Sequence, residues 1–112
     1  MKRLLPLLLI LVFCAWHSPA SADDSPFSTS PYQDVFLFSG PGITYQSLGQ
    51  ITAGVPLTIV ERNSIGTWVH VQLGRDDGTL IYDGWVISGF LNINPKLNFA
   101  DVPVNTKLAD AD

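Results

Sequence analysis

His70 is the one histidine that follows the first 22 residues, and it is the residue there best suited to acid–base chemistry. Serines and aspartates are plentiful enough to complete a Ser-His-Asp triad, but no serine stands in a recognisable nucleophile turn. His70 also lies within an alternating apolar run, where a half-exposed strand histidine is the simpler interpretation. We therefore expect no catalytic residue and no enzymatic activity.

Asp76-Asp77-Gly78 is an acidic run that could suggest a calcium loop. It lacks the further oxygen ligands and the closing glutamate that such a loop needs. Aspartate beside glycine is more simply the chemistry of a tight turn. Cys14, the only cysteine, offers no thiolate downstream because it falls within the first 22 residues. We expect neither a metal ion nor another cofactor.

Aromatic side chains are the most informative group for binding. Tryptophan and tyrosine combine a large apolar surface with a polar group, and they dominate binding hot spots. The alternative is that such rings fill a small core, and this alternative stays open for Trp85 and Phe90. Trp68 favours a surface role, because strand alternation points it away from Val69 and Val71. The predicted ligand-binding groove contains Tyr45, Trp68, Tyr82, Trp85 and Phe90.

The segments that position these residues have the two-residue period of β-strands. Residues 67–73 alternate strictly, with Val69, Val71 and Leu73 on the predicted core side. Similar runs, bounded by Gly, Pro, Asn and Asp, occupy residues 34–38, 56–61, 80–82 and 84–87. No segment after residue 22 has a helical period of useful length. The sequence therefore predicts an all-β fold.

Glycines mark the turns between these runs. Gly40 and Gly42 flank a proline where the chain must reverse, and glycine tolerates the positive φ that such a turn can need. Gly66 and Gly84 each precede a tryptophan, which predicts that a strand begins close against another backbone at both places.

The strands and turns carry an ordered set of short motifs, namely Ser39-Gly40-Pro41-Gly42, Tyr45, Gly66-Thr67-Trp68, Gly84-Trp85-Val86 and Phe90-Leu91. This set resembles a bacterial SH3 (SH3b) domain over about residues 33–93. The resemblance implies a small SH3-like barrel of about five antiparallel strands over residues 33–94. It also implies that Tyr45, Trp68 and Phe90 correspond to positions that line a shared groove in such barrels.

Two features depart from the family pattern. Phe36-Leu37-Phe38 replaces the polar residues that usually precede the Ser-Gly-Pro-Gly turn. The hairpin between Leu73 and Gly84 is also longer than usual, which is expected to change the surface beside it.

The first 22 residues have the pattern of a secretory signal peptide. Lys2 and Arg3 precede an apolar run from Leu7 to Trp16, and Ala20-Ser21-Ala22 matches the A-x-A cleavage site. The run is shorter than the roughly 20 residues of a membrane-spanning helix. Lipid attachment at Cys14 is disfavoured, because a bulky phenylalanine precedes it where the processing needs a small residue.

Two polar segments flank the predicted barrel. Residues 23–32 are rich in Ser, Pro and Asp, and are expected to form a flexible linker. Residues 95–112 lack a sustained period and are expected to form a mobile C-terminal tail, in which a few apolar residues could dock locally.

The net charge argues against two classes of partner. The full chain carries a formal charge of −4, from 6 Lys and Arg against 10 Asp and Glu. Removing residues 1–22 takes away Lys2 and Arg3 but no acidic residue, which leaves a charge of −6. Nucleic-acid binding needs cations to displace phosphate counterions, and anionic lipid attracts basic rather than acidic surfaces. We expect no nucleic acid as partner and no membrane insertion after cleavage.

These features together predict an exported binding module, periplasmic or secreted, that recognises a peptidoglycan peptide or a partner protein. The alternative is an accessory or structural subunit of an exported complex, in which the apolar segment Val35–Phe38 would serve as a sheet edge for assembly. A small hydrolase is a distant third, because so short a chain with one histidine has little from which to build an active site.

Overall fold

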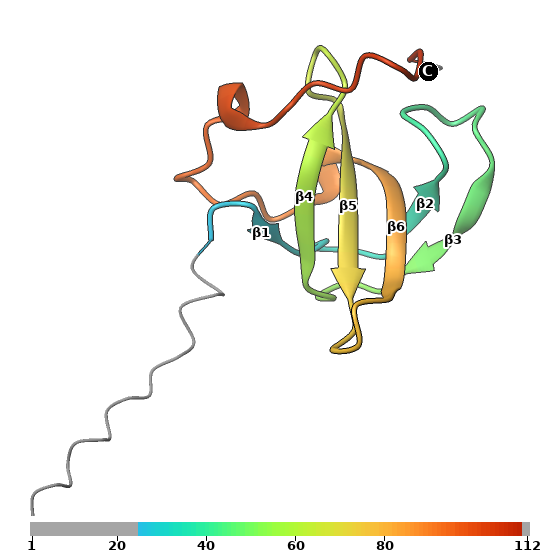
Figure 1. The fold of residues 1–112 in the computed structure, drawn as a ribbon, viewed down its shortest axis with the longest axis vertical. Helices are drawn as coiled ribbons and strands as arrows, with labels where there is room; N and C mark the ends of the chain where they lie inside the picture. The colour runs from blue at the N-terminus through green and yellow to red at the C-terminus, as the bar shows by residue number, and fades with distance from the viewer. Residues whose placement is uncertain (1–24, 111–112) are drawn as a thin grey trace, which may run out of the picture.

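Six antiparallel strands form one open sheet in the computed structural model, which describes residues 25–110 (Figure 1). The strand order is β1-β4-β5-β6-β2-β3. Two short 3-10 helices follow the last strand, and the described residues contain no α-helix. The elements are β1 (Ser28–Thr29), β2 (Val35–Phe38), β3 (Ser47–Ile51), β4 (Leu57–Arg62), β5 (Trp68–Gly74), β6 (Leu80–Ile87), η4 (Ser88–Phe90) and η5 (Phe99–Asp101).

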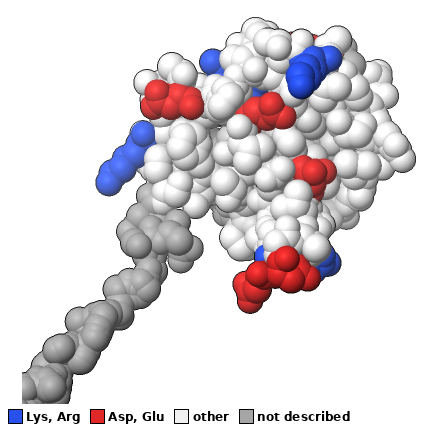
Figure 2. Space-filling model, viewed as in Figure 1, with Lys and Arg blue, Asp and Glu red and all other residues white. Residues whose placement is uncertain are grey.

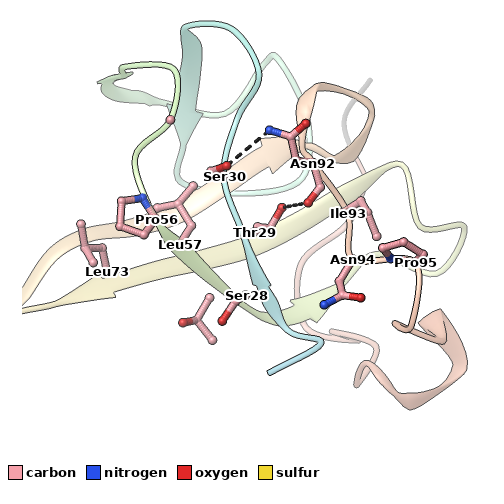
Figure 3. Close-up of a pocket in the computed structure, with 12 residues that line it drawn as sticks. Ser28, Thr29, Ser30, Pro56, Leu57, Leu73, Asn92, Ile93, Asn94 and Pro95 are labelled. Carbon is pink, nitrogen blue, oxygen red and sulfur yellow. Dashed lines mark hydrogen bonds between the residues drawn. The ribbon is translucent and has the colours of Figure 1, made fainter. Parts of the chain in front are cut away.

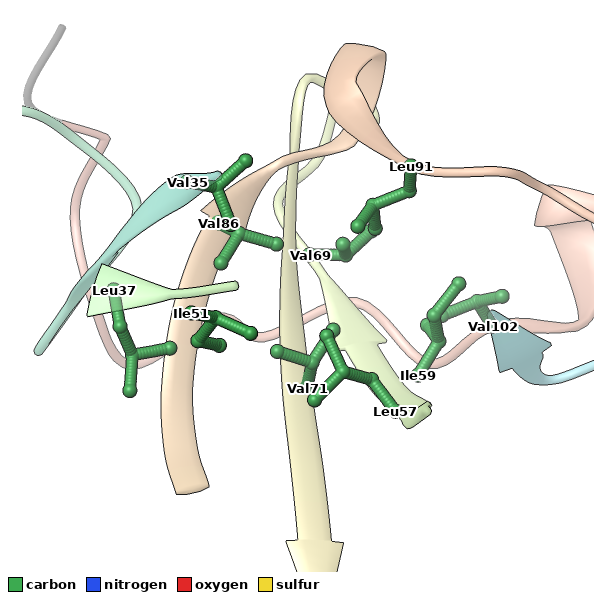
Figure 4. Close-up of a cluster of buried hydrophobic side chains, with 10 residues drawn as sticks. All are labelled: Val35, Leu37, Ile51, Leu57, Ile59, Val69, Val71, Val86, Leu91 and Val102. Atoms are coloured by element: carbon green, nitrogen blue, oxygen red, sulfur yellow. The ribbon is translucent and has the colours of Figure 1, made fainter. Parts of the chain in front are cut away.

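The sheet curls around a single apolar core (Figure 4). Val69 and Val71 of β5 are fully buried at its centre, as their alternation predicted. Ile51 of β3 and Leu57 of β4 join the same cluster although their strands lie toward opposite ends of the strand order, so the sheet must bend to bring them together. The buried cluster comprises Val35, Leu37, Ile51, Leu57, Ile59, Val69, Val71, Val86, Leu91 and Val102.

The all-β prediction is confirmed, with one strand beyond the five expected. The additional strand, β1, comes from the segment expected to be a flexible linker, and it pairs with the first two residues of β4. Further main-chain bonds hold this segment, since the Ile59 amide donates to the Phe27 carbonyl at 2.9 Å. The Thr29 hydroxyl donates to the Asn92 carbonyl at 2.9 Å. Strand propensity alone did not predict β1, because polar Ser and Thr are held there by pairing with β4.

The segment after residue 95, expected to be a mobile tail, packs against the sheet as far as η5 and beyond. Val102 is buried in the core. The Arg62 guanidinium donates from Nε to the Phe99 carbonyl at 2.9 Å, and Arg62 forms a parallel bridge with Val104. A domain this small has too little apolar surface of its own to close its core, so isolated apolar residues from the flanks complete it.

Strand β2 lies inside the sheet, between β3 and β6. The expectation that Val35–Phe38 forms a free edge for assembly is therefore wrong: the edges among the described strands are β1 and β3. The sequence pattern could not show this, because alternation assigns the faces of a strand and not its neighbours.

The signal-peptide prediction concerns residues 1–22, which lie outside the described residues. Within residues 25–110 no helix has the length and apolar character needed to cross a membrane.

Candidate functional site

The side of the sheet opposite the core carries two of the five predicted site residues, Trp68 and Trp85. Cross-strand pairing places Trp68 opposite Ile87, His70 opposite Trp85, and Trp85 opposite Phe38. Residues directly opposite each other in antiparallel strands have neighbouring side chains, so these form a continuous row. We call this surface the aromatic face, and it consists of Phe36, Phe38, Trp68, His70, Trp85 and Ile87.

Both tryptophans of the aromatic face are buried by their neighbours. Trp68 is 3% exposed and Trp85 is 2% exposed. The Phe38 ring meets Trp68 edge to face, with centroids 5.5 Å apart at 80°. The His70 ring stacks on Trp85 at 5.4 Å and 17°. Trp68 thus points away from the core, as predicted, but it supports the aromatic face from beneath instead of meeting solvent.

Asn63 fixes the start of β5 and with it the position of Trp68. Its buried side chain accepts a hydrogen bond from the Trp68 amide at 3.0 Å and donates to the Thr67 hydroxyl at 2.9 Å. The Asn63 amide in turn donates to the Trp68 carbonyl at 3.0 Å. A buried amide with these bonds is fully engaged, and it holds the β4–β5 turn in one conformation.

His70 lies between two carboxylates. Its Nδ1 lies 2.7 Å from Glu61 Oε2 and its Nε2 lies 2.6 Å from Asp83 Oδ1. The imidazolium form donates to both oxygens, whereas the neutral ring donates to only one. Because both ring nitrogens face carboxylates, neither is placed to take a proton from a serine hydroxyl, as a triad histidine must. The geometry favours the interpretation of His70 as a structural strand histidine.

Asp83 is electrostatically coupled to His70. Partial burial raises the pKa of Asp83, but hydrogen bonds from His70 and Gln72 and the charge of His70 outweigh burial, so this pKa lies below its ordinary value. The Gln72 amide donates to the same Asp83 oxygen at 3.1 Å. Within residues 25–110 no group of three or more His, Cys, Asp or Glu is arranged to hold a metal ion.

Replacing Asp83 with asparagine is expected to flatten the pH dependence of stability in acid. A carboxylate whose folded pKa is lowered stabilises the fold above its unfolded pKa, about pH 4, and this contribution is lost as the pH falls through the folded pKa. Urea unfolding at pH 5 and pH 3 should show a smaller loss of unfolding free energy for Asp83→Asn than for the wild type. Asp76→Asn is the charge-matched control, in the exposed β5–β6 hairpin. Equal losses of unfolding free energy for Asp83→Asn and the wild type would contradict the coupling between Asp83 and His70.

The acidic hairpin between β5 and β6 is built as a turn. The Asp77 carboxylate accepts hydrogen bonds from the Thr79 hydroxyl at 2.7 Å and the Thr79 amide at 2.9 Å. These two bonds lower the pKa of Asp77. Gly78 has a φ of 90°, which completes the tight turn expected from the sequence. Figure 2 shows acidic groups gathered at the tip of this hairpin, while most of the visible surface is uncharged.

Tyr45 lies in the loop between β2 and β3, residues 39–46. Its ring packs on Gly40 so closely that a Cβ there would lie 2.5 Å from it. Its hydroxyl donates to the Ala109 carbonyl at 2.5 Å. The loop and the C-terminal segment therefore meet at this tyrosine.

An apolar cleft opens between β2, the 39–46 loop and η4, beside the aromatic face. It has a volume of about 220 Å³. Its rim exposes large apolar side chains, with Phe36 59% and Ile43 63% exposed. Tyr32 continues this surface at 55% exposure, and its ring meets Phe90 edge to face. The cleft is lined by Gln33, Asp34, Val35, Phe36, Phe38, Ile43, Ile87 and Phe90.

The five residues of the predicted groove are only partly brought together. Phe90 lines the cleft, and Trp68 and Trp85 form the buried floor of the aromatic face. Tyr45 lies apart from them in the 39–46 loop, and Tyr82 lies on the other side of β6 and packs against the core. Strand alternation explains the position of Tyr82, because Tyr82 lies on the same face of β6 as Val86 and on the opposite face from Trp85.

Sequence reasoning missed several residues of the cleft, including Phe36, Phe38 and Ile87. A usable signal existed in β2, where Val35 and Leu37 alternate with the two phenylalanines. Buried Val35 and Leu37 leave Phe36 and Phe38 on the outer face by strand geometry alone.

A second, wider groove of about 880 Å³ runs between β1, β4 and the segment after η4 (Figure 3). Its walls mix polar and apolar side chains, and Asn92 donates to the Ser30 hydroxyl at 3.3 Å within it. None of the five predicted site residues lines this groove. Main-chain pairing with β4 and the bond from the Thr29 hydroxyl to the Asn92 carbonyl join β1 to the rest of the fold, so we interpret the groove as a seam between the N-terminal strand and the sheet.

Comparison with known proteins identifies the family. The chain matches the family model described as bacterial SH3 domain over residues 34–92. Searches of curated proteins and of solved structures gave no match. The matched segment includes β2 to β6 and η4, and with them the aromatic face and the cleft. Because this match spans more than half of the sequence, the chain belongs to the bacterial SH3 domain family.

Proposed function

We propose that this protein is an exported, non-catalytic binding module that recognises a cell-wall peptide or an extended segment of a partner protein through its aromatic face. Family membership indicates a binding module. The observation that supports the site is the open apolar cleft, whose rim exposes Phe36 and Ile43. Exposed apolar surface gathered around a concave site is typical of ligand recognition.

The cleft suits a peptide better than a charged polymer. Phe36, Phe38 and Phe90 supply rigid apolar contacts, which bind with little loss of side-chain entropy. Asp34 at the rim already accepts a hydrogen bond from the Ala53 amide at 2.9 Å, so it shapes the neighbouring turn. The acidic net charge does not favour nucleic acid. Export to the periplasm or the medium is part of this proposal and rests on the pattern of residues 1–22.

A non-catalytic role is supported by the surroundings of His70. Glu61 and Asp83 occupy both of its nitrogens, and the ring itself stacks on Trp85. These contacts hold His70 in place as a packing residue of the aromatic face.

Replacing Phe36 with alanine is expected to weaken ligand binding about tenfold, because exposed aromatic anchors carry much of the energy of such sites. The measurement is co-sedimentation of residues 23–112 with purified peptidoglycan. Phe36→Ala should also leave the unfolding free energy within about 0.5 kcal/mol of the wild type, because this side chain is mostly exposed.

Ile81→Ala is the matched control for this experiment, since Ile81 is an exposed apolar residue in the β5–β6 hairpin, outside the cleft. Pelleting of the wild type and the control, but not of Phe36→Ala, would support cell-wall recognition through the cleft. Absence of pelleting for the wild type would refute the cell-wall ligand, and affinity capture would then test for a protein ligand.

The second candidate function, a subunit of an exported complex, is favoured by strand β3. Among the described strands, β3 pairs with β2 alone, and Leu48 on it is exposed. A sheet edge with one free side can pair with another chain. Gel filtration distinguishes the two functions, because assembly through β3 would give an oligomer and a peptide-binding module would elute as a monomer.

A further inference from the structure

The C-terminal segment, residues 103–109, adds to the edge of β4 beyond the end of β1. The Arg62 amide donates to the Pro103 carbonyl at 2.9 Å, and the Asn105 amide donates to the Arg62 carbonyl at 2.9 Å. These bonds form a parallel bridge between Arg62 and Val104. The segment is therefore held as an extended peptide that adds to a sheet edge.

The same segment then spans from β4 to the 39–46 loop. Asn105 Nδ2 donates to Glu61 Oε1 at 3.1 Å at one end, and Ala109 accepts from the Tyr45 hydroxyl at the other. Glu61 belongs to β4 and Tyr45 to the 39–46 loop, and strands β5 and β6 lie between them in the sheet. Figure 1 shows the chain running across the end of these strands toward the 39–46 loop.

We propose that the C-terminal segment occupies part of the ligand site in the free protein, and that an extended polypeptide ligand binds by displacing it. This inference rests on the proposed function of the aromatic face. The cleft around Phe36 stays open, while the segment covers Glu61, the carboxylate that contacts His70 of the aromatic face. A ligand that enters the cleft and continues along the aromatic face therefore meets the segment.

The contact with Glu61 indicates what the ligand must provide. One Glu61 oxygen faces His70 and the other accepts the Asn105 amide. Displacement leaves this second oxygen without its donor, so a ligand needs an N–H group at the same position. An amine forms a stronger, charge-assisted bond there than an amide, whereas a carboxylate is repelled. The ligand class is thus an extended peptide with an amide or amine side chain over Glu61.

Tethering makes the segment an effective competitor. A segment joined to the domain by a short connection has an effective concentration on the order of millimolar. A free peptide with the same contacts must compete with it, so the wild type should bind such a peptide weakly. Releasing the segment should raise the affinity for the peptide by about tenfold or more.

The test uses the full chain and a synthetic peptide of residues 103–110, PVNTKLAD. Asn105→Pro removes the amide that bonds Arg62 and the side chain that bonds Glu61. Asn105→Asp is the second releasing variant, because it places a carboxylate against Glu61. Thr106→Ala, at the exposed neighbouring position, is the control. Hydrogen exchange of the Arg62 amide reports release, and fluorescence anisotropy reports peptide binding.

The expected result is faster exchange at Arg62 and about tenfold tighter peptide binding in both releasing variants, with the control unchanged. A peptide carrying Asn105→Asp should bind about tenfold more weakly than the parent peptide. Equal peptide binding by the wild type and the released variants, including no binding by either, would overturn the proposal. Exchange at Arg62 that is as fast in the wild type as in the variants would overturn it as well.

Peptidoglycan is absent from this assay, so its outcome is independent of the cell-wall experiment. If the wild type does not pellet with peptidoglycan but the releasing variants bind the peptide more tightly, the cell-wall ligand is refuted. The proposal that the C-terminal segment competes with a peptide ligand then stands. If Asn105→Pro and the wild type pellet with peptidoglycan to the same extent, the proposed cell-wall binding stands. The proposal that the ligand displaces the C-terminal segment is then refuted.

Discussion

Replacing Trp68 with alanine is expected to lower the free energy of unfolding by about 4 kcal/mol, the typical cost of deleting a buried tryptophan. Trp68 is 3% exposed, and its ring packs against Phe38 across the sheet. Removing the indole leaves a void that neighbouring strands cannot fill, because their backbones are paired with each other. A small domain has only about 5–10 kcal/mol of unfolding free energy in total, so this variant should keep only about 1–6 kcal/mol of it.

Urea unfolding followed by circular dichroism measures this effect without relying on tryptophan fluorescence. Phe36→Ala is the comparison, since it removes a mostly exposed ring from the same face and should cost less than about 0.5 kcal/mol. Trp68→Phe should fall between them, because a ring remains against Phe38. A Trp68→Ala protein as stable as Phe36→Ala would show that Trp68 is not part of the packed floor. A loss of ligand binding in Trp68→Ala would therefore reflect disturbed packing beneath the aromatic face and not a lost contact with the ligand, because Trp68 is buried.

The contrast between Trp68 and Val69 shows how far the sequence could predict this fold. Strict alternation in β5 assigned Val69 to the core and Trp68 to the opposite side, and both assignments hold. Alternation says nothing about what covers a face, so the sequence suggested that Trp68 meets solvent. Its burial depends on Phe38, which is distant in sequence and adjacent only through the β2–β6 pairing.

The flanking segments escaped prediction for a related reason. Val102 has no periodic neighbours, so nothing in its local sequence marks it as a core residue, yet it fills the apolar cluster. Asn105 and Ala109 likewise contact the site through single bonds to Glu61 and Tyr45. Such contacts depend on the path of the chain in three dimensions, which secondary-structure periods do not encode.

The glycines show that a position can require glycine either for its local backbone conformation or because of a tertiary contact. Gly40 and Gly42 were expected to supply a positive φ, but neither has one. Gly40 is required because the Tyr45 ring occupies the space of a side chain. Gly66 does have a positive φ, of 77°, in the β4–β5 turn. A turn-forming sequence therefore indicates where a glycine is needed, whereas the reason can lie in a residue that packs against it.

At Gly84 the predicted close approach of two backbones is confirmed. Replacing Gly84 with alanine is expected to lower the free energy of unfolding by about 3 kcal/mol. A Cβ on this residue would lie 2.8 Å from the Phe38 carbonyl oxygen and 2.8 Å from Leu37 Cγ. One of these atoms belongs to the backbone of β2, which is paired on its other side with β3 and cannot retreat alone. The methyl group must therefore push β2 away from β6, and this separates Phe38 from the floor of the aromatic face.

Gly74→Ala is the matched control, because Gly74 lies in β5, where a Cβ would be 3.7 Å from its nearest neighbour, an ordinary contact. It should leave the unfolding free energy within about 0.5 kcal/mol of the wild type, whereas Gly84→Ala should lower it by several times that amount. Because Phe38 also lines the cleft, any Gly84→Ala protein that remains folded should bind its ligand more weakly than the Gly74→Ala control. Equal stability of the two variants would mean that β2 can move away from β6 with no loss of unfolding free energy. The close contact between β2 and β6 would then not explain the glycine at position 84.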